Sequence, residues 1–164
     1  MKSYSTIISV AVWAGLLIAA GAYAAQTGVV SATVTAQNIS VAVQDASIAY
    51  GSLALSASYS TLAAEANDLQ FASNIGNLTE DFNIQGADTA SWTLESAIGS
   101  EQYTHEFSTN RGTVWVKLST SYQQLVDAVA QNVSQQFDLQ ITVPSGTSDF
   151  TQQTAAVTVQ AVAD

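Results

Sequence analysis

The chain has no cysteine, a single proline and only three basic residues against thirteen acidic ones. Without cysteine it can form neither a disulfide nor a thiolate metal site, so its stability must come from a core, bound ions or neighbouring subunits. The excess of acidic residues repels phosphate groups, which argues against nucleic-acid binding and against docking to anionic membranes.

The first 24 residues have the pattern of a secretory signal peptide. Lys2 precedes an apolar run over residues 7–20, and Ala22-Tyr23-Ala24 forms a small-x-small cleavage pattern. The alternative is a retained membrane anchor, because the apolar stretch through Ala25 approaches the roughly 20 residues that a span needs. We therefore expect a secreted protein, extracellular or at the cell surface, with membrane contact only if this segment is uncleaved.

Cleavage after Ala24 leaves residues 25–164. This length is enough for one domain with its own core but is short for two domains that each fold stably. Only Arg111 and Lys117 then remain as bases, and two bases against thirteen acids leave a formal net charge of −11. An exported domain without cysteine fits a prokaryotic secreted or cell-surface protein better than a eukaryotic one.

Alternation of apolar and polar residues dominates this domain and predicts strands. Leu69, Phe71 and Ile75 share one face of residues 68–76, and Phe82 pairs with Ile84 on the next segment. Trp92 with Leu94 forms a further short strand. The other alternating segments are residues 29–36, 38–44, 53–60, 101–107, 113–118, 137–143 and 155–163. This many short strands predict an antiparallel β-sandwich, with a closed barrel as the alternative.

One segment departs from this pattern. In residues 121–131, Tyr122, Leu125, Val126 and Val129 recur at helical spacing, and Ser121 can cap a helix start. The spacing predicts one short helix that crosses between strands.

Three stretches carry a resemblance to known surface domains. The first is "ATVTAQNISVAVQDASIAYGSLAL" (32–55), a strand followed by a D-x-x-(apolar)-x-(aromatic)-G-x-L turn and strand, whose places are held by Asp45, Ile48, Tyr50, Gly51 and Leu53. The second is "FASNIGNLTEDFNIQG" (71–86), which is followed by Trp92. The third is "QQFDLQITVPSG" (135–146), a strand that runs into a proline turn at Pro144. These stretches resemble immunoglobulin-like β-sandwich domains of secreted prokaryotic cell-surface proteins. The resemblance implies an immunoglobulin-like module that serves in adhesion, surface layers or fibres.

The N-terminal part of the domain, residues 25–38, is uncharged and alternating. Val30, Ala32 and Val34 alternate with Ser31, Thr33 and Thr35. Such a strand is an aggregation-prone edge unless something covers it. It either pairs within its own sheet or inserts into a neighbouring subunit as a donated strand, which would build a fibre.

Residues 73–86 hold the most conspicuous acidic group, Glu80 beside Asp81. Adjacent residues of a strand face opposite ways, so the two carboxylates cannot meet at one substrate atom as a glycosidase requires. Asn77, Glu80 and Asp81 are weak candidates for a calcium site, because the spacing of a calcium loop is absent. We expect a turn that leads into a strand.

We expect no catalytic residues. His105 is the only histidine and shares a face with Tyr103 and Phe107, which predicts packing at the core edge. No G-x-S-x-G elbow is present, and one histidine without cysteine removes most zinc chemistry. The protein is therefore predicted not to be an enzyme and to need no cofactor, calcium apart.

Trp115 is predicted to face away from Val114 and Val116, and serves either as a carbohydrate platform or interface anchor or as a covered packing residue. Three N-x-[ST] sequons begin at Asn38, Asn77 and Asn132 and would matter in a host that glycosylates exported proteins.

These observations predict a structural or adhesive protein that acts outside the cell. It would associate with itself or with other cell-envelope proteins, and assemble into a fibre through its N-terminal strand. The alternative is a carbohydrate-binding module that uses Trp115, with polysaccharide as partner and a bound calcium ion.

Overall fold

The computed structural model describes residues 27–164, and residues 35–164 form one compact unit of strands. Ten strands follow in chain order: β1 (Val41–Gln44), β2 (Ser58–Ser60), β3 (Gln70–Asn74), β4 (Glu80–Gly86), β5 (Thr93–Leu94), β6 (Gln102–Ser108), β7 (Val116–Lys117), β8 (Gln123–Val129), β9 (Ser134–Thr142) and β10 (Val157–Ala163). The expected all-β class is confirmed for these residues.

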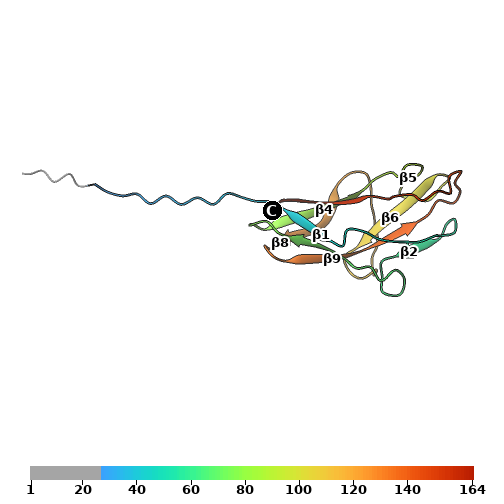
Figure 1. Ribbon diagram of the computed structural model, residues 1–164, viewed down its shortest axis with the longest axis horizontal. Helices are drawn as coiled ribbons and strands as arrows, with labels where there is room; N and C mark the ends of the chain where they lie inside the picture. Colours follow the sequence, from blue (N-terminus) through green and yellow to red (C-terminus); the bar gives the residue numbers. More distant parts are fainter. Residues whose placement is uncertain (1–26) are drawn as a thin grey trace, which may run out of the picture. The chain divides into compact units, whose positions relative to one another are not determined.

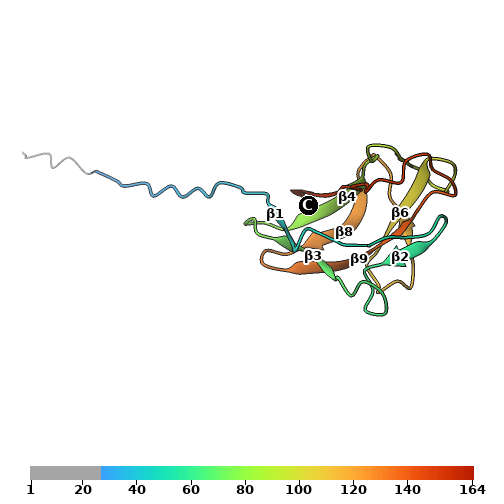
Figure 2. The same ribbon diagram turned by 45° about the vertical axis from the view of Figure 1, so that its right-hand side comes forward.

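The strands form two sheets (Figures 1 and 2). The larger sheet has the order β1-β3-β9-β6-β5, with β2 paired to β9 and β7 paired to β6. The smaller sheet has the order β10-β4-β8. All pairs are antiparallel except the short β5–β6 pair. Within residues 27–164, the end strands of both sheets pair along one edge only.

One core lies between the two sheets. Phe82 and Ile84 of the smaller sheet are fully buried, as their alternation predicts. They pack in one cluster with apolar side chains of the larger sheet: Ala72, Tyr103, Phe107, Phe137, Leu139 and Ile141. Because both sheets contribute to the same cluster, the domain has the two-layer character of a sandwich.

Residues 121–131 form no helix, and the prediction of a crossing helix is wrong. They contain β8, which pairs with β4 through two register shifts. Each shift is a β-bulge, which inserts an extra residue and breaks the period of two. Ala128, at φ 52°, lies within one of them. The bulges place Leu125 and Val129 in the core, so a strand carries apolar residues at a spacing that imitates a helix.

Alternation identified strands better than it identified their buried faces. In β3 the buried residues are Gln70, Ala72 and Asn74, whereas Phe71 is half-buried and Ile75 is 56% exposed. The face predicted to be apolar is therefore the outer one. Gln70 and Asn74 are accommodated because their side-chain amides donate hydrogen bonds, to Asp68 and to the Leu78 and Val129 carbonyls respectively.

The N-terminal segment differs from expectation as well. Residues 27–40 form no strand, and residues 27–39 are exposed. The signal-peptide prediction for residues 1–24 falls outside the part of the chain that the structure describes. Within residues 27–164 no helix has the length and apolar character needed to cross a membrane.

Because residues 121–131 contain a strand, Leu125 and Tyr122 should contribute unequally to stability. A helix would bury both on one face. Leu125 is 6% exposed and Tyr122 is 42% exposed. We expect Leu125→Ala to lower the free energy of unfolding by about 2–5 kcal/mol, because it leaves a cavity in the core. Tyr122→Ala, as the control, should lower it by less than about 1 kcal/mol. Urea denaturation of both variants measures this, and equal losses would contradict the strand.

Candidate functional site

The turn between β3 and β4 holds the chain that leads into β1. Asn77 accepts a hydrogen bond from the Asn38 amide at 2.8 Å through Oδ1 and donates one to the Ala36 carbonyl at 2.7 Å through Nδ2. The backbone amides of Ile75 and Asn77 donate to the carbonyls of Ser40 and Asn38. We call this set of contacts between residues 74–80 and residues 36–40 the clamp.

Glu80 completes the clamp from inside the domain. Its side chain is fully buried, and Oε1 accepts a hydrogen bond from the Ser40 amide at 2.9 Å. Oε2 has no hydrogen-bond partner within residues 27–164. A Cβ atom at position 76 would collide with the Glu80 carboxylate and the Asn38 carbonyl, so only glycine fits there. Residues 74–80 thus position residues 36–40, which lead into β1.

Beyond the clamp, a groove lies between two segments of the domain. β1 lies against β10, but the chain turns out of β1 at Asp45 and Ala46, both with positive φ (67° and 51°). Past this turn, an apolar groove of about 1250 Å³ opens between residues 46–55 on one bank and residues 147–159 on the other. Figures 1 and 2 show the segment that joins β1 to β2 and the red segment that leads into β10 running lengthwise along the domain.

The groove has an apolar floor and little charge. Its floor is the inward surface of β9 and β6, with Phe137, Leu139 and Ile141 among the lining residues. Ile48, Tyr50 and Leu53 line one bank, and Val157 and Val159 line the other. These five bank residues are half-buried, and Asp149 is the only acidic residue in the lining.

Both banks offer free backbone groups. Apart from the Ala54 carbonyl, which accepts a hydrogen bond from the Ala57 amide, the amides and carbonyls of residues 46–55 make no hydrogen bond to another backbone group within residues 27–164. On the opposite bank, β10 pairs with β4 along one edge only, and no strand within the described chain occupies its other edge. A strand laid in the groove would meet hydrogen-bonding edges on either side.

A buried polar pair lies at the groove floor. His105 is 2% exposed, and its Nε2 is 3.0 Å from the Tyr50 hydroxyl. Burial lowers the pKa of His105 to about 4, and burial likewise raises the pKa of Tyr50. Both groups are therefore neutral near pH 7. His105 packs against the Tyr103 ring as predicted, so the pair serves as a neutral polar part of an apolar surface.

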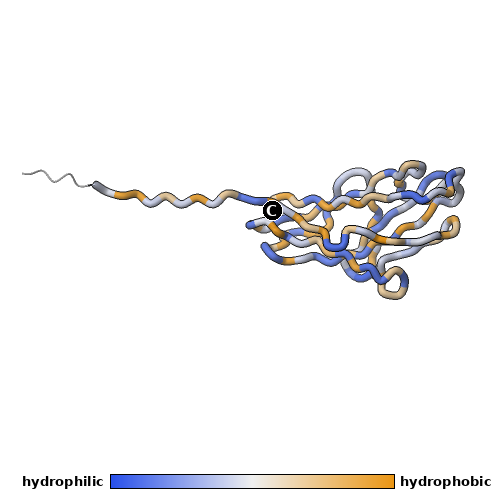
Figure 3. Tube along the Cα trace, in the orientation of Figure 1, coloured by the Kyte–Doolittle hydropathy of each residue, from blue (hydrophilic) through white to orange (hydrophobic). Residues whose placement is uncertain are grey.

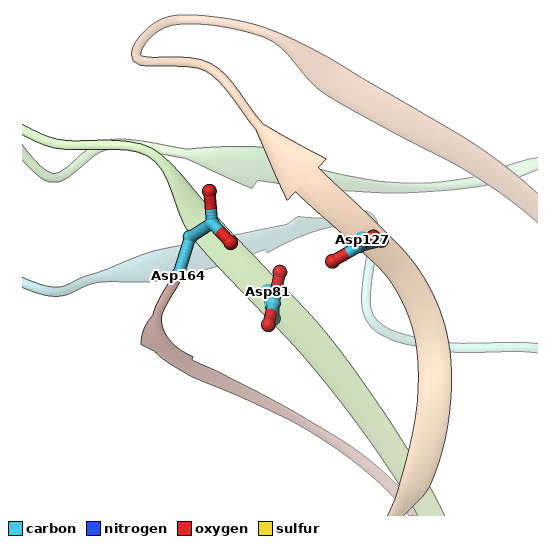
Figure 4. Close-up of side chains that lie close together, drawn as sticks. All are labelled: Asp81, Asp127 and Asp164. Atoms are coloured by element: carbon cyan, nitrogen blue, oxygen red, sulfur yellow. The ribbon is translucent and has the colours of Figure 1, made fainter.

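Asp81 lies on the outer face of β4 and stabilises a bulge. Its Oδ1 accepts a hydrogen bond from the Ala128 amide at 2.9 Å. Asp127 and Asp164 lie nearby, and carboxylate oxygens of the three residues fall within 4.8 Å of one another (Figure 4). A hydrogen bond with Asp81 and the negative charge of Asp81 raise the pKa of Asp127. A proton on Asp127 can thus reduce the repulsion between this carboxylate and that of Asp81.

The three residues named as a calcium site do not converge. Asn77 and Glu80 bind residues 36–40, whereas Asp81 faces the opposite side of β4. Its acidic neighbours are Asp127 from β8 and Asp164 beyond β10, which sequence reasoning missed. No spacing could have found them, because strand pairing alone joins positions this far apart. Calcium binding stays a prediction.

Trp115 is half-buried, while Val114 and Val116 are 56% and 44% exposed, so the predicted facing is reversed. A Cβ atom at Gly112 would lie 3.2 Å from the Trp115 ring and 2.8 Å from Leu62, which places the ring in a packed corner. Its carbohydrate role stays a prediction.

The three sequon asparagines are exposed. Asn77 alone among them uses its side-chain amide in the clamp, so a glycan there would compete with the contact to Ala36.

Comparison of the chain with family models, with curated proteins and with solved structures found no match.

The clamp predicts a local effect of Asn77→Ala. Loss of both side-chain hydrogen bonds should lower the free energy of unfolding by about 1–2 kcal/mol. It should also speed hydrogen exchange at the Asn38 amide, which NMR measures. Asn83→Ala on β4 is the control, because no hydrogen bond of its side chain is seen within residues 27–164. Unchanged exchange at Asn38 would contradict the clamp.

The buried His105 predicts acid sensitivity. Its folded pKa of about 4 lies below the ordinary 6.5, so its stabilising effect is complete above pH 6.5 and is lost as the pH falls through 4. The loss amounts to about 3 kcal/mol, at about 1.4 kcal/mol per pH unit.

The test compares the wild type with His105→Gln by urea denaturation from pH 7 to pH 4. The glutamine variant should be less stable at pH 7, and the difference should shrink by about 3 kcal/mol at pH 4. Stability curves that stay parallel would show that His105 does not titrate in this way.

Proposed function

We propose that this protein is a secreted structural or adhesive component of a cell surface or extracellular matrix, and that its copies assemble into a fibre through the N-terminal segment. The observation that carries the proposal is the state of residues 27–35. They are exposed, uncharged and without a strand partner in the described chain, and Val29, Val30 and Val34 are each more than 90% exposed.

Figure 3 follows hydrophobic positions alternating with more polar ones along this segment. A soluble domain that exposes such a segment gains free energy when the valines are covered, because apolar surface leaves water. Backbone groups of an unpaired extended segment also favour pairing with a sheet edge. Both effects support self-association through residues 27–35.

The charge distribution supports the same mode of assembly. A domain with a formal charge of −11 repels its copies over most of its surface. Residues 25–44 contain no charged side chain, so contacts made by this segment avoid that repulsion. The clamp also fixes residues 36–40, which directly follow residues 27–35, to the domain.

The proposal includes an immunoglobulin-like strand arrangement and no catalytic role. Two sheets around one core are compatible with this arrangement. The acidic groups act in the clamp and at the β8 bulge, and His105 is enclosed at the groove floor, which favours structural roles for them.

Loss of residues 27–35 should abolish assembly and leave a soluble, folded domain, because the core belongs to residues 35–164. A milder variant replaces Val29, Val30 and Val34 by Ser. Its control replaces Ser31 by Thr and both Thr33 and Thr35 by Ser, which keeps the alternation. Light scattering after size exclusion and negative-stain microscopy measure the assemblies. If all variants assemble as the wild type does, the N-terminal segment is not the connector.

A further inference from the structure

We propose that the groove between residues 46–55 and β10 is the acceptor site for residues 27–35 of a second copy of this chain. The inference rests on the proposed function, which names the donated segment but not where it binds. The inserted segment would lie along the free edge of β10 and extend the smaller sheet.

The dimensions agree. Residues 27–35 and residues 151–159, the bank that runs from the segment before β10 into its first three residues, are nine residues each. At about 3.3 Å per residue, each spans about 30 Å when extended. Apart from Ala54 and Thr151, whose backbone groups already take part in hydrogen bonds, backbone groups on both banks can then pair with the insert.

The chemistry agrees as well. One face of the donor carries Val30, Ala32 and Val34, which match the apolar floor of the groove. The whole groove lining contains one acidic residue, Asp149, which lies on a bank. At the groove rim, Phe150 is 80% exposed and Leu55 is 48% exposed. An inserted strand would cover both. The opposite donor face, with Val29, Ser31 and Thr33, would face outward beside the exposed Thr158.

The clamp favours a second copy over the chain's own segment. Ala36 and Asn38 are held by Asn77 next to the end of β10, where Ala163 pairs with Glu80. The groove lies at the other end of β10, beside Val157 and Val159, and along the residues that precede it. Insertion into its own groove would require the chain to reverse at the residues that the clamp fixes.

The first test uses two chains that each lack one half of the contact. Val159→Lys places a charge in the groove but keeps the donor, and deletion of residues 27–35 keeps the groove but removes the donor. Each variant alone should be monomeric. Mixed together they should form dimers and nothing larger, as seen by light scattering after size exclusion.

The second test keeps the groove intact and uses the absence of cysteine in the chain. Cross-strand neighbours lie close enough for a disulfide. In the parallel register that places Ala32 and Val34 beside Val157 and Val159, Thr33 lies beside Thr158. Thr33→Cys in one chain should therefore be oxidised to a dimer with Thr158→Cys in another, and mass spectrometry should identify the linked peptide. Gln124→Cys on β8, the other edge of the smaller sheet, is the matched control and should not link.

The outcomes separate the two proposals. If the wild type is monomeric at every concentration, the proposed function fails and the acceptor site with it. If deletion of residues 27–35 abolishes assembly but a folded Val159→Lys variant still assembles, strand donation stands and the groove is not the acceptor. Linkage to Gln124→Cys instead of Thr158→Cys would also overturn the groove. If Val159→Lys fails to fold, the disulfide test decides alone.

Discussion

The buried carboxylate of Glu80 and the Ser40 amide form the contact on which much of this architecture depends. Through it and the two hydrogen bonds of Asn77, the segment before β1 is joined to the turn before β4. The contact places β1 at the edge of the larger sheet, next to β10. It also sets the point where the N-terminal segment leaves the domain. The path of residues 36–40 over the domain therefore depends on one buried acidic group and its neighbours.

Past the clamp, the two-layer domain is open along one seam, which is the groove between residues 46–55 and residues 147–159. The chain leaves β1 at two residues with positive φ, and the following ten residues run beside β10 without pairing to it. An open seam exposes apolar surface and backbone groups, which a lone domain normally avoids. The exposed valines of residues 27–35 likewise leave apolar surface in water. An acidic domain without disulfides thus carries two neutral, incompletely covered features, and their mutual burial would satisfy both.

Part of the fold could be predicted because alternation is a local property. Phe82 and Ile84, Tyr103 with His105 and Phe107, and Phe137 with Leu139 and Ile141 all lie buried on strands as expected. The failures share a cause that is not local. The spacing of β8 resembles that of a helix because its bulges are imposed by pairing with β4. β3 buries the polar Asn74 because the distant Val129 carbonyl of β8 accepts its hydrogen bond. Residues 29–36 alternate like a strand but have no partner in the described chain.

The sequence by itself determined the all-β class, the strong negative charge and the neutral N-terminal segment, because composition and short-range alternation depend on neighbouring residues alone. Only the tertiary structure decided what residues 73–86 do. Their turn holds the chain before β1, Glu80 faces inward to Ser40, and Asp81 faces outward to the β8 bulge. The groove was likewise beyond prediction, since its banks and floor come from four distant parts of the chain. Such features arise from strand pairing and from the path of loops between strands, which no local pattern encodes.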